Sequence, residues 1–136
     1  MAIARIYERV VIDTKIILRC LLQDSSTQSP EASRVILEAP KIIITDVVLM
    51  ECAYVMSLLY KKTHQQIALS LGLFIKRNNV VYEAGLAEYY LGLYVLGSLD
   101  LADCYLVAYA LKHNETLQTF DKKLQRVYEA ERAKVA

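Results

Sequence analysis

Short runs of apolar and β-branched residues alternate along the chain with longer apolar segments of helical length. The short runs have the length and composition of buried strands, and the longer segments carry helix-start signals such as Thr, Asp or Ser-Pro. The predicted strands cover residues 10–12, 41–44, 79–82 and 116–120. The predicted helices cover residues 15–22, 30–38, 47–61, 63–77, 84–96 and 99–112, with a short helix from 121 and an amphipathic tail over 126–136.

This alternation predicts an α/β fold with a mainly parallel sheet and helices on both of its faces. The length of 136 residues predicts one domain over 1–136, with a core over about 10–124, a short N-terminal extension and a charged C-terminal tail. Ligands in such folds bind where the chain leaves the carboxyl ends of the strands. That edge of the sheet is therefore where functional side chains are expected.

Composition excludes several classes of protein. With 55% hydrophobic and 23% charged residues, the chain is expected to be compact and not disordered. A net charge of +1 provides no general basic field for nucleic acid. No apolar run reaches the roughly 18 residues of a membrane span, and the N-terminus lacks a signal-peptide pattern. Cys20, Cys52 and Cys104 form no CxxC pair and are expected to be buried thiols of a cytoplasmic protein.

Carboxylates occur at unusual places in this pattern. Asp13 ends the first predicted strand, Asp121 follows the fourth, and Glu51 and Asp103 interrupt apolar helices. Taken singly, Asp13 and Asp121 are explained as helix caps, and Glu51 is explained by one ion pair. Taken together, the four lie at points that a parallel sheet brings to one edge. Clustered carboxylates repel one another unless a cation joins them, and all-oxygen ligands suit Mg²⁺ or Mn²⁺, the ions typical of phosphodiester hydrolysis.

Four segments carry a resemblance to a known family. They are VVIDTKIILRCLLQD, IITDVVLMECAYVM, LDLADCYLVAYALKHN and LQTFDKKL, and they span about residues 10–124. In their order and spacing they resemble PIN domains, and most of all the VapC-type toxins of toxin–antitoxin pairs. The resemblance implies a three-layer α/β/α fold with a central sheet of four or five strands. It also implies a ribonuclease that uses one or two Mg²⁺ or Mn²⁺ ions.

The resemblance also implies roles for individual residues. Asp13, Asp103 and Asp121 correspond to metal-holding acids, and Glu51 to an acid that completes the shell or orients the attacking water. The supporting positions are Thr119, which matches the hydroxyl residue before the last acid, and Asp100, an outer-shell acid. Among the basic residues, we expect Lys122, Lys123 and Arg19 to bind RNA phosphates. His64 and His113 are predicted to be surface residues at helix ends.

The sequence departs from the family pattern at one position, where Lys15 replaces the usual Asn of an Asp-Thr-Asn motif. Its ammonium group either points away along the helix surface or sits among the carboxylates in place of the metal. The second possibility corresponds to another function, a catalytically silent PIN-like module that binds RNA or a partner protein. A phosphoacceptor receiver domain is a weaker alternative, because receivers place paired acids after the first strand and only Asp13 stands here.

The resemblance further implies protein partners. The family usually forms homodimers and binds an antitoxin chain that covers the groove. The apolar helices predicted over 45–61 and 63–77 expose many Leu, Ile and Tyr side chains and are the expected interface. The full expectation is thus an endoribonuclease toxin with RNA, antitoxin and a second copy of itself as partners, and with no membrane association.

Overall fold

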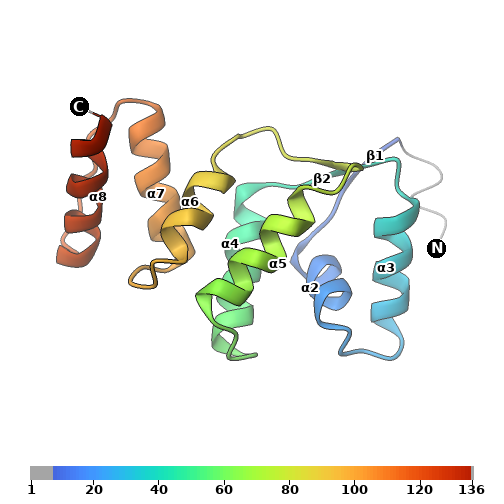
Figure 1. Cartoon of the computed structure of the whole chain (residues 1–136). Coiled ribbons are helices and arrows are strands. Elements are labelled where there is room, and N and C mark those ends of the chain that lie inside the picture. The colour runs from blue at the N-terminus through green and yellow to red at the C-terminus, as the bar shows by residue number, and fades with distance from the viewer. Residues whose placement is uncertain (1–7, 136) are drawn as a thin grey trace.

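The computed structural model describes residues 8–135 and consists of a short sheet with helices packed against it (Figure 1). Its order is β1 (Arg9–Val11), α2 (Thr14–Leu22), α3 (Gln28–Glu38), β2 (Lys41–Ile43), α4 (Asp46–Leu58), α5 (His64–Ile75), β3 (Val80–Val81), α6 (Ala87–Tyr94), α7 (Leu101–Lys112) and α8 (Lys122–Val135). Each of these elements coincides with a predicted one to within a few residues. The predicted α/β class is therefore confirmed.

The sheet is parallel and has three strands in the order β1-β2-β3. Val10 pairs with Ile42, and Ile42 pairs with Val80, so that β2 is central. Ile42 is fully buried, as expected for a central strand covered on both faces. Both β1 and β2 lead directly into helices, α2 and α4, so the starts of these two helices lie at the same edge of the sheet.

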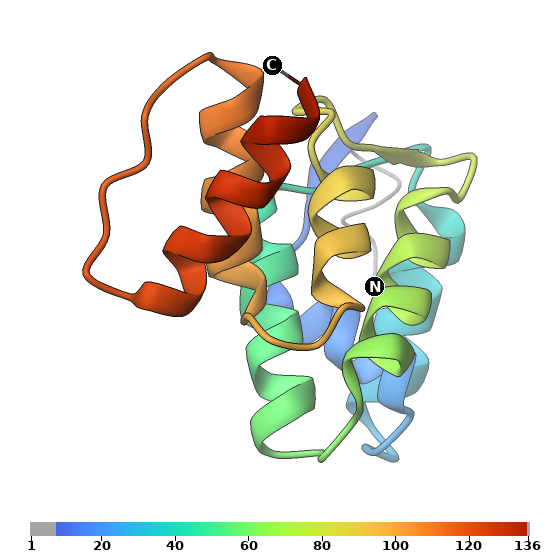
Figure 2. The same cartoon turned by 60° about the vertical axis from the view of Figure 1, so that its left-hand side comes forward.

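The prediction of a fourth strand over residues 116–120 is wrong. The segment is a loop, and within residues 8–135 it pairs with no strand. Figure 2 shows that it swings outward from α7 before α8 begins. Of its residues only Leu117 and Thr119 are half-buried, and Phe120 is fully exposed. The β-branched pattern was present, but the burial that stabilises a strand is missing because α8 packs back against α7.

The helices form a continuous series of packed neighbours. Helix α2 packs on α3 and α4, α4 packs on α5 and α7, α6 lies between α5 and α7, and α8 packs on α7. In Figure 1 the series runs from α3 at one end of the molecule to α8 at the other. The fully buried side chains along it include Leu49 and Cys52 on α4, Ile67 on α5, and Tyr90 on α6. Helix α4 is thus the central helix of the core.

The helix starts show which predicted caps form. Asp13 caps α2, as expected for this residue taken singly: its Oδ1 accepts a hydrogen bond from the Ile16 amide at 3.1 Å. Thr45 caps α4, and Thr63 caps α5 in a capping box with Gln66. Helix α6 begins at residue 87, later than predicted, because Gly85 adopts a positive φ of 73° in the turn before it.

The remaining general expectations have mixed outcomes. Cys52 and Cys104 are buried, whereas Cys20 is only half-buried. His113 is exposed as predicted, but His64 is half-buried and stacks on the Tyr94 ring with centroids 3.8 Å apart. Within residues 8–135, no helix combines the length and apolar character needed to cross a bilayer.

Candidate active site

The first candidate acid, Asp13, lies where β1 ends and α2 begins. Its side chain is exposed, and its one hydrogen bond within the described residues is the capping bond from the Ile16 amide. A cap of this kind fixes the direction of the carboxylate without neutralising its charge. Asp13 therefore presents an exposed carboxyl group at the sheet edge.

Glu51 lies on α4 next to this edge. The neighbouring Cys52 thiol is 4.0 Å from the carbonyl oxygen of Thr14, so the middle of α4 packs against the first turn of α2. Burial, followed by the negative charges of Glu51 and Asp13, raises the pKa of the Cys52 thiol to about 12. Asp13, at the start of α2, and Glu51, one residue before Cys52 on α4, therefore both lie near the contact between these two helices.

The second group of acids lies around the first turn of α7. Asp100 caps this helix by accepting a hydrogen bond from the Asp103 amide at 2.8 Å. Burial raises the pKa of the Asp103 carboxyl, and the negative charges of Asp100 and Asp121 raise it further. The negative charges of Asp100 and Asp121 therefore both act on the Asp103 carboxyl.

Asp121 is held by the turn that begins α8. Its Oδ1 accepts hydrogen bonds from the amides of Lys123 and Leu124, at 2.9 and 3.2 Å. The Asp121 amide in turn donates to Thr119 Oγ1 at 3.0 Å. Thr119 therefore helps to fix the turn that carries Asp121.

Helix α4 connects the two groups of acids. A hollow of about 320 Å³ lies between α4 and α7, and Met50 and Ala53 line it opposite Asp100 and Leu101. The stretch of α4 that carries Glu51 thus faces α2 on one side and the start of α7 on the other. Within the described part of the chain, no three acidic, His or Cys side chains stand close enough together to hold a metal ion. The carboxylates form two neighbouring groups, Asp13 with Glu51 and Asp103 with Asp100 and Asp121.

The family comparison decides the class of this arrangement. A family model of the PIN domain matches residues 10–130. The chain is a PIN-domain protein. No curated protein and no solved structure gives a match. PIN domains are generally nucleases that use divalent metals, and the matched region contains every acid described above. The donor set of this PIN domain consists of carboxylate oxygens, the ligand type that Mg²⁺ and Mn²⁺ prefer.

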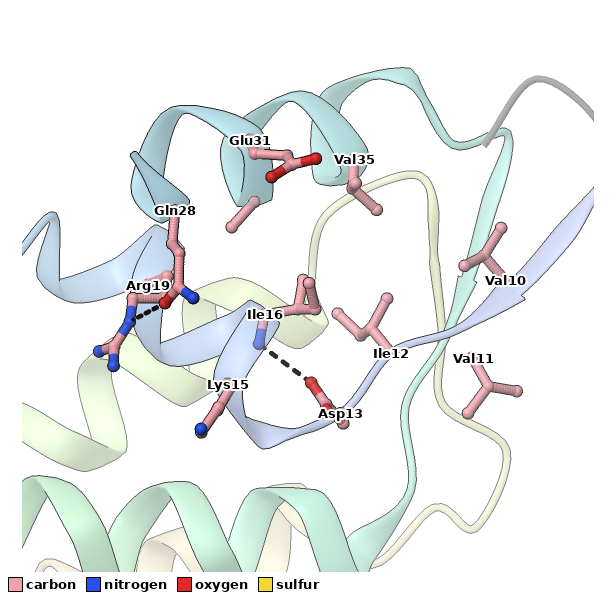
Figure 3. Close-up of a pocket in the computed structure, with 11 residues that line it drawn as sticks. Val10, Val11, Ile12, Asp13, Lys15, Ile16, Arg19, Gln28, Glu31 and Val35 are labelled. Atoms are coloured by element: carbon pink, nitrogen blue, oxygen red, sulfur yellow. Dashed lines mark hydrogen bonds between the residues drawn. The ribbon is translucent and has the colours of Figure 1, made fainter. Parts of the chain in front are cut away.

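Lys15, the departure from the family motif, lies on the first turn of α2 and is exposed. Figure 3 shows its side chain directed away from the Asp13 carboxylate. Among the described residues no ion pair joins Lys15 to an acid. In this arrangement Lys15 lies near Asp13 without pairing with it and is directed along the helix surface, which is the first of the two possibilities considered for Lys15.

The three basic residues expected to bind RNA differ in their surroundings. Lys122 and Lys123 are exposed on the first turn of α8, directly after Asp121. Cations at a helix N-terminus oppose the helix dipole, so their position does not serve helix stability. Arg19 is instead engaged within the fold, since it pairs with Asp24 at 3.2 Å and donates to Gln28 at 2.9 Å.

The sequence did not reveal one structural acid near the site, Asp46. Its Oδ1 accepts hydrogen bonds from the hydroxyls of Tyr82 at 2.5 Å and Tyr90 at 2.7 Å. Burial and the bond to Asp46 raise the pKa of Tyr82 to about 12. The interaction ties the start of α4, which carries Glu51, to β3–α6. The excess of tyrosine was its only sequence signal, and this does not identify the partner.

Proposed function

We propose that this PIN-domain protein is a Mg²⁺- or Mn²⁺-dependent endoribonuclease that hydrolyses RNA phosphodiester bonds. The observation that carries the proposal is the PIN-domain match over residues 10–130, which contains Asp13, Glu51, Asp103 and Asp121. Burial and the charges of Asp100 and Asp121 also raise the pKa of Asp103, and among the described residues no ion pair joins a cation to these acids. A divalent cation bound beside these acids would relieve this repulsion. Mg²⁺ and Mn²⁺, the ions typical of phosphodiester hydrolysis, are therefore the cations that we expect the site to bind.

In this proposal Asp13, Asp103 and Asp121 hold one or two ions directly or through water. Glu51, on the helix between the two groups, completes the shell or orients the attacking water. When bound, the metal ion lowers the pKa of that water and offsets negative charge on the phosphate. Asp100 and Thr119 position Asp103 and Asp121 through the first turn of α7 and the turn before α8.

Basic side chains beside the acids supply the contacts to RNA. Lys122 and Lys123 follow Asp121 directly and are exposed, so they bind phosphates that flank the cut. Arg19 binds a phosphate of the same RNA strand once its ion pair with Asp24 is broken. Loss of either lysine is expected to weaken the affinity for RNA of any sequence and to make that affinity less dependent on salt concentration.

We further propose that the protein is the toxin of a VapBC-type toxin–antitoxin pair and acts as a homodimer. The toxin assignment is supported by the order and spacing of the four motifs over about residues 10–124. The homodimer is supported by large apolar side chains exposed along two packed helices, which are Tyr54, Leu58, Leu69 and Leu73 on α4 and α5. A monomeric mass in light scattering at micromolar concentration would contradict the homodimer.

A catalytically silent module with Lys15 as the resident cation is the alternative. The absence of an ion pair to Lys15 within residues 8–135 favours the active enzyme over this alternative. The deciding variant is Lys15→Asn. If only the variant binds Mn²⁺, Lys15 occupies the site in solution and the silent module is correct.

The experiment that tests the enzyme is a calorimetric Mn²⁺ titration combined with cleavage of single-stranded RNA. The wild type is compared with Asp13→Asn, with Asp103→Asn and with Glu129→Gln, a matched change of an exposed acid on α8 away from the site. We expect Mn²⁺ binding and cleavage in the wild type and in Glu129→Gln, and neither in the two Asn variants. Equal cleavage by all four proteins overturns the proposal.

A further inference from the structure

A hollow of about 430 Å³ lies between β1, α2 and α3, directly beside Asp13 (Figure 3). Its volume falls within the range of small-molecule sites, about 300–1,000 Å³. The inner surface is aliphatic and comes from all three elements, with Val10 and Ile12 near β1, Ile16 on α2, and Ala32 and Val35 on α3. This open space is not needed for Asp13 to hold a metal ion, and it is not needed for β1, α2 and α3 to pack together.

Polar side chains line the edge of the hollow, and two of them are uncommitted. Arg19 is paired with Asp24 and bonded to Gln28, as described above. Lys15 and Glu31 are exposed and have no hydrogen bond or ion pair among the described residues. Figure 3 shows Lys15 and Asp13 at one edge, on the start of α2, and Glu31 across the hollow on α3. Within the described residues, the edge therefore carries the unpaired ammonium group of Lys15 next to Asp13 and the unpaired carboxylate of Glu31 on the opposite side of the hollow.

We propose that this hollow binds a base of the RNA strand next to the scissile phosphate, with Lys15 on the adjoining phosphate and Glu31 on the edge of the base. The inference rests on the proposed nuclease function and adds a determinant of cleavage specificity to it. The flat faces of an unstacked base pack against the aliphatic side chains. Lys15 opposes the dipole at the start of α2, so a phosphate is the group that this position favours.

The chemistry of Glu31 predicts which bases bind. An ionised carboxylate only accepts hydrogen bonds, so it favours bases with an exocyclic amino group: adenine, cytosine and guanine. Uracil presents carbonyl oxygens on either side of its single N–H, and these repel the carboxylate. The hollow should therefore direct cleavage to sites next to an amino-bearing base and away from runs of uridine.

The test uses a uridine 9-mer and matched 9-mers with one adenosine, cytidine or guanosine at the centre, with Mn²⁺ and with the cut positions mapped. We expect the wild type and Glu129→Gln to cut next to the amino-bearing base about tenfold faster than in the uridine strand. Glu31→Gln also donates hydrogen bonds, so the difference should fall to about twofold. Lys15→Ala should raise KM about tenfold with a smaller change in kcat.

A second variant, Ile16→Trp, tests the aliphatic surface of the hollow. Ile16 is half-buried at the hollow, so Ile16→Trp fills the space and should abolish the base preference while the thermal unfolding midpoint stays near that of the wild type. If the wild type cuts RNA and both Glu31→Gln and Ile16→Trp keep its base preference, the base site is wrong. If they instead change the mass in light scattering and leave cutting unaltered, the hollow binds protein, and the base site is again wrong.

Failure of the nuclease function gives a different result. If the wild type cuts no strand with Mn²⁺, the same fluorescent 9-mers are titrated in EDTA and binding is followed by anisotropy. If the wild type binds the amino-bearing strands about tenfold more tightly than the uridine strand, and Glu31→Gln abolishes this preference, the base site is correct although the protein is not a nuclease. Equal or absent binding overturns the base site as well.

Discussion

Two sets of carboxylates in this molecule have different surroundings. In one set, tyrosine hydroxyls donate to the acid: Tyr60 to Asp24 at 2.5 Å, and Tyr82 and Tyr90 to Asp46. Glu131 on α8 belongs to the same set, since Tyr89 and Lys134 both donate to it. In the other set, the candidate site, Asp13 and Asp121 accept hydrogen bonds only from amides of their own helix starts, among the residues described.

The difference separates acids that hold the fold together from acids for which we propose a chemical role. A tyrosine hydroxyl satisfies a carboxylate across two elements without adding a positive charge, so the acid becomes a structural link. Within residues 8–135, four tyrosines donate in this way, in a chain that has 10 tyrosines and 2 phenylalanines. The candidate site acids have no such donor among the described residues, and Asp103 bears the repulsion of its neighbours. Proteins accept such a cost in stability where activity needs it.

The largest expected effect is at the candidate site. We expect Asp103→Asn to lower the rate of RNA cleavage by about 100-fold to 1,000-fold, or about 3–4 kcal/mol of transition-state stabilisation. The same change removes a carboxylate whose pKa is raised by burial and by the charges of Asp100 and Asp121. The metal-free variant should therefore unfold a few degrees above the wild type in calorimetry. A variant that is less stable and fully active would place Asp103 among the structural acids.

Asp46 should behave in the opposite way. Asp46→Ala leaves the hydroxyls of Tyr82 and Tyr90 without their acceptor, and each orphaned group costs about 1–3 kcal/mol. We expect the free energy of unfolding in urea to fall by about 2–3 kcal/mol in total. Asp46→Asn keeps an acceptor oxygen and should lose less. Cleavage per folded molecule should stay within about threefold of wild type for both variants. A loss as large as that of Asp103→Asn would mean that Asp46 acts in the chemistry.

Features that depend on local interactions were predicted from the sequence, whereas features that depend on packing between distant segments were not. Helix α5 was predicted with its capping box because Thr63 and Gln66 are three residues apart. The three strands were predicted because their apolar runs lie between clear helix signals. The loop over 116–120 has the same local pattern as a strand, and only the packing of α8 against α7 removes it from the sheet.

The candidate site was predictable as a set of residue types and only partly as an arrangement. Asp13, Glu51, Asp103 and Asp121 were selected from their positions at strand ends and in apolar helices. Their division into two groups depends on how α4 packs between α2 and α7, which no local pattern encodes. Asp46 was missed for the same reason, because its tyrosine partners lie 36 and 44 residues away in the sequence.

A smaller effect tests whether the Asp46 interactions act as one unit. Tyr82 and Tyr90 donate to the same oxygen, Oδ1 of Asp46. We expect Tyr82→Phe and Tyr90→Phe each to lower the free energy of unfolding by about 1 kcal/mol. The double variant should deviate from additivity by about 0.5 kcal/mol or more, because each hydroxyl compensates for loss of the other. Strict additivity in a urea double-mutant cycle would mean that the two bonds are independent.

The smallest effect compares the two sets of acids through pH. Burial tends to raise the pKa of Glu131, but hydrogen bonds from Lys134 and Tyr89 outweigh it, and the net pKa is lowered. The stability that Glu131 contributes is therefore present above its unfolded pKa of about 4.3 and is lost as pH falls through the folded pKa. Glu131→Gln should melt about 1–3 °C below the wild type at pH 7, and the gap should close below about pH 4.

The pKa of Asp103 is raised, so its effect on stability depends on pH in the opposite direction. Protonation of Asp103 favours the folded state, and this stability is lost as pH rises through the folded pKa. Metal-free Asp103→Asn should thus melt above the wild type at pH 7 and approach it near pH 4. Melting curves of both variants between pH 4 and 7 measure the two slopes directly. Slopes of the same sign would remove the distinction between the two sets, because Asp103 would then be stabilised by its surroundings in the same way as Glu131.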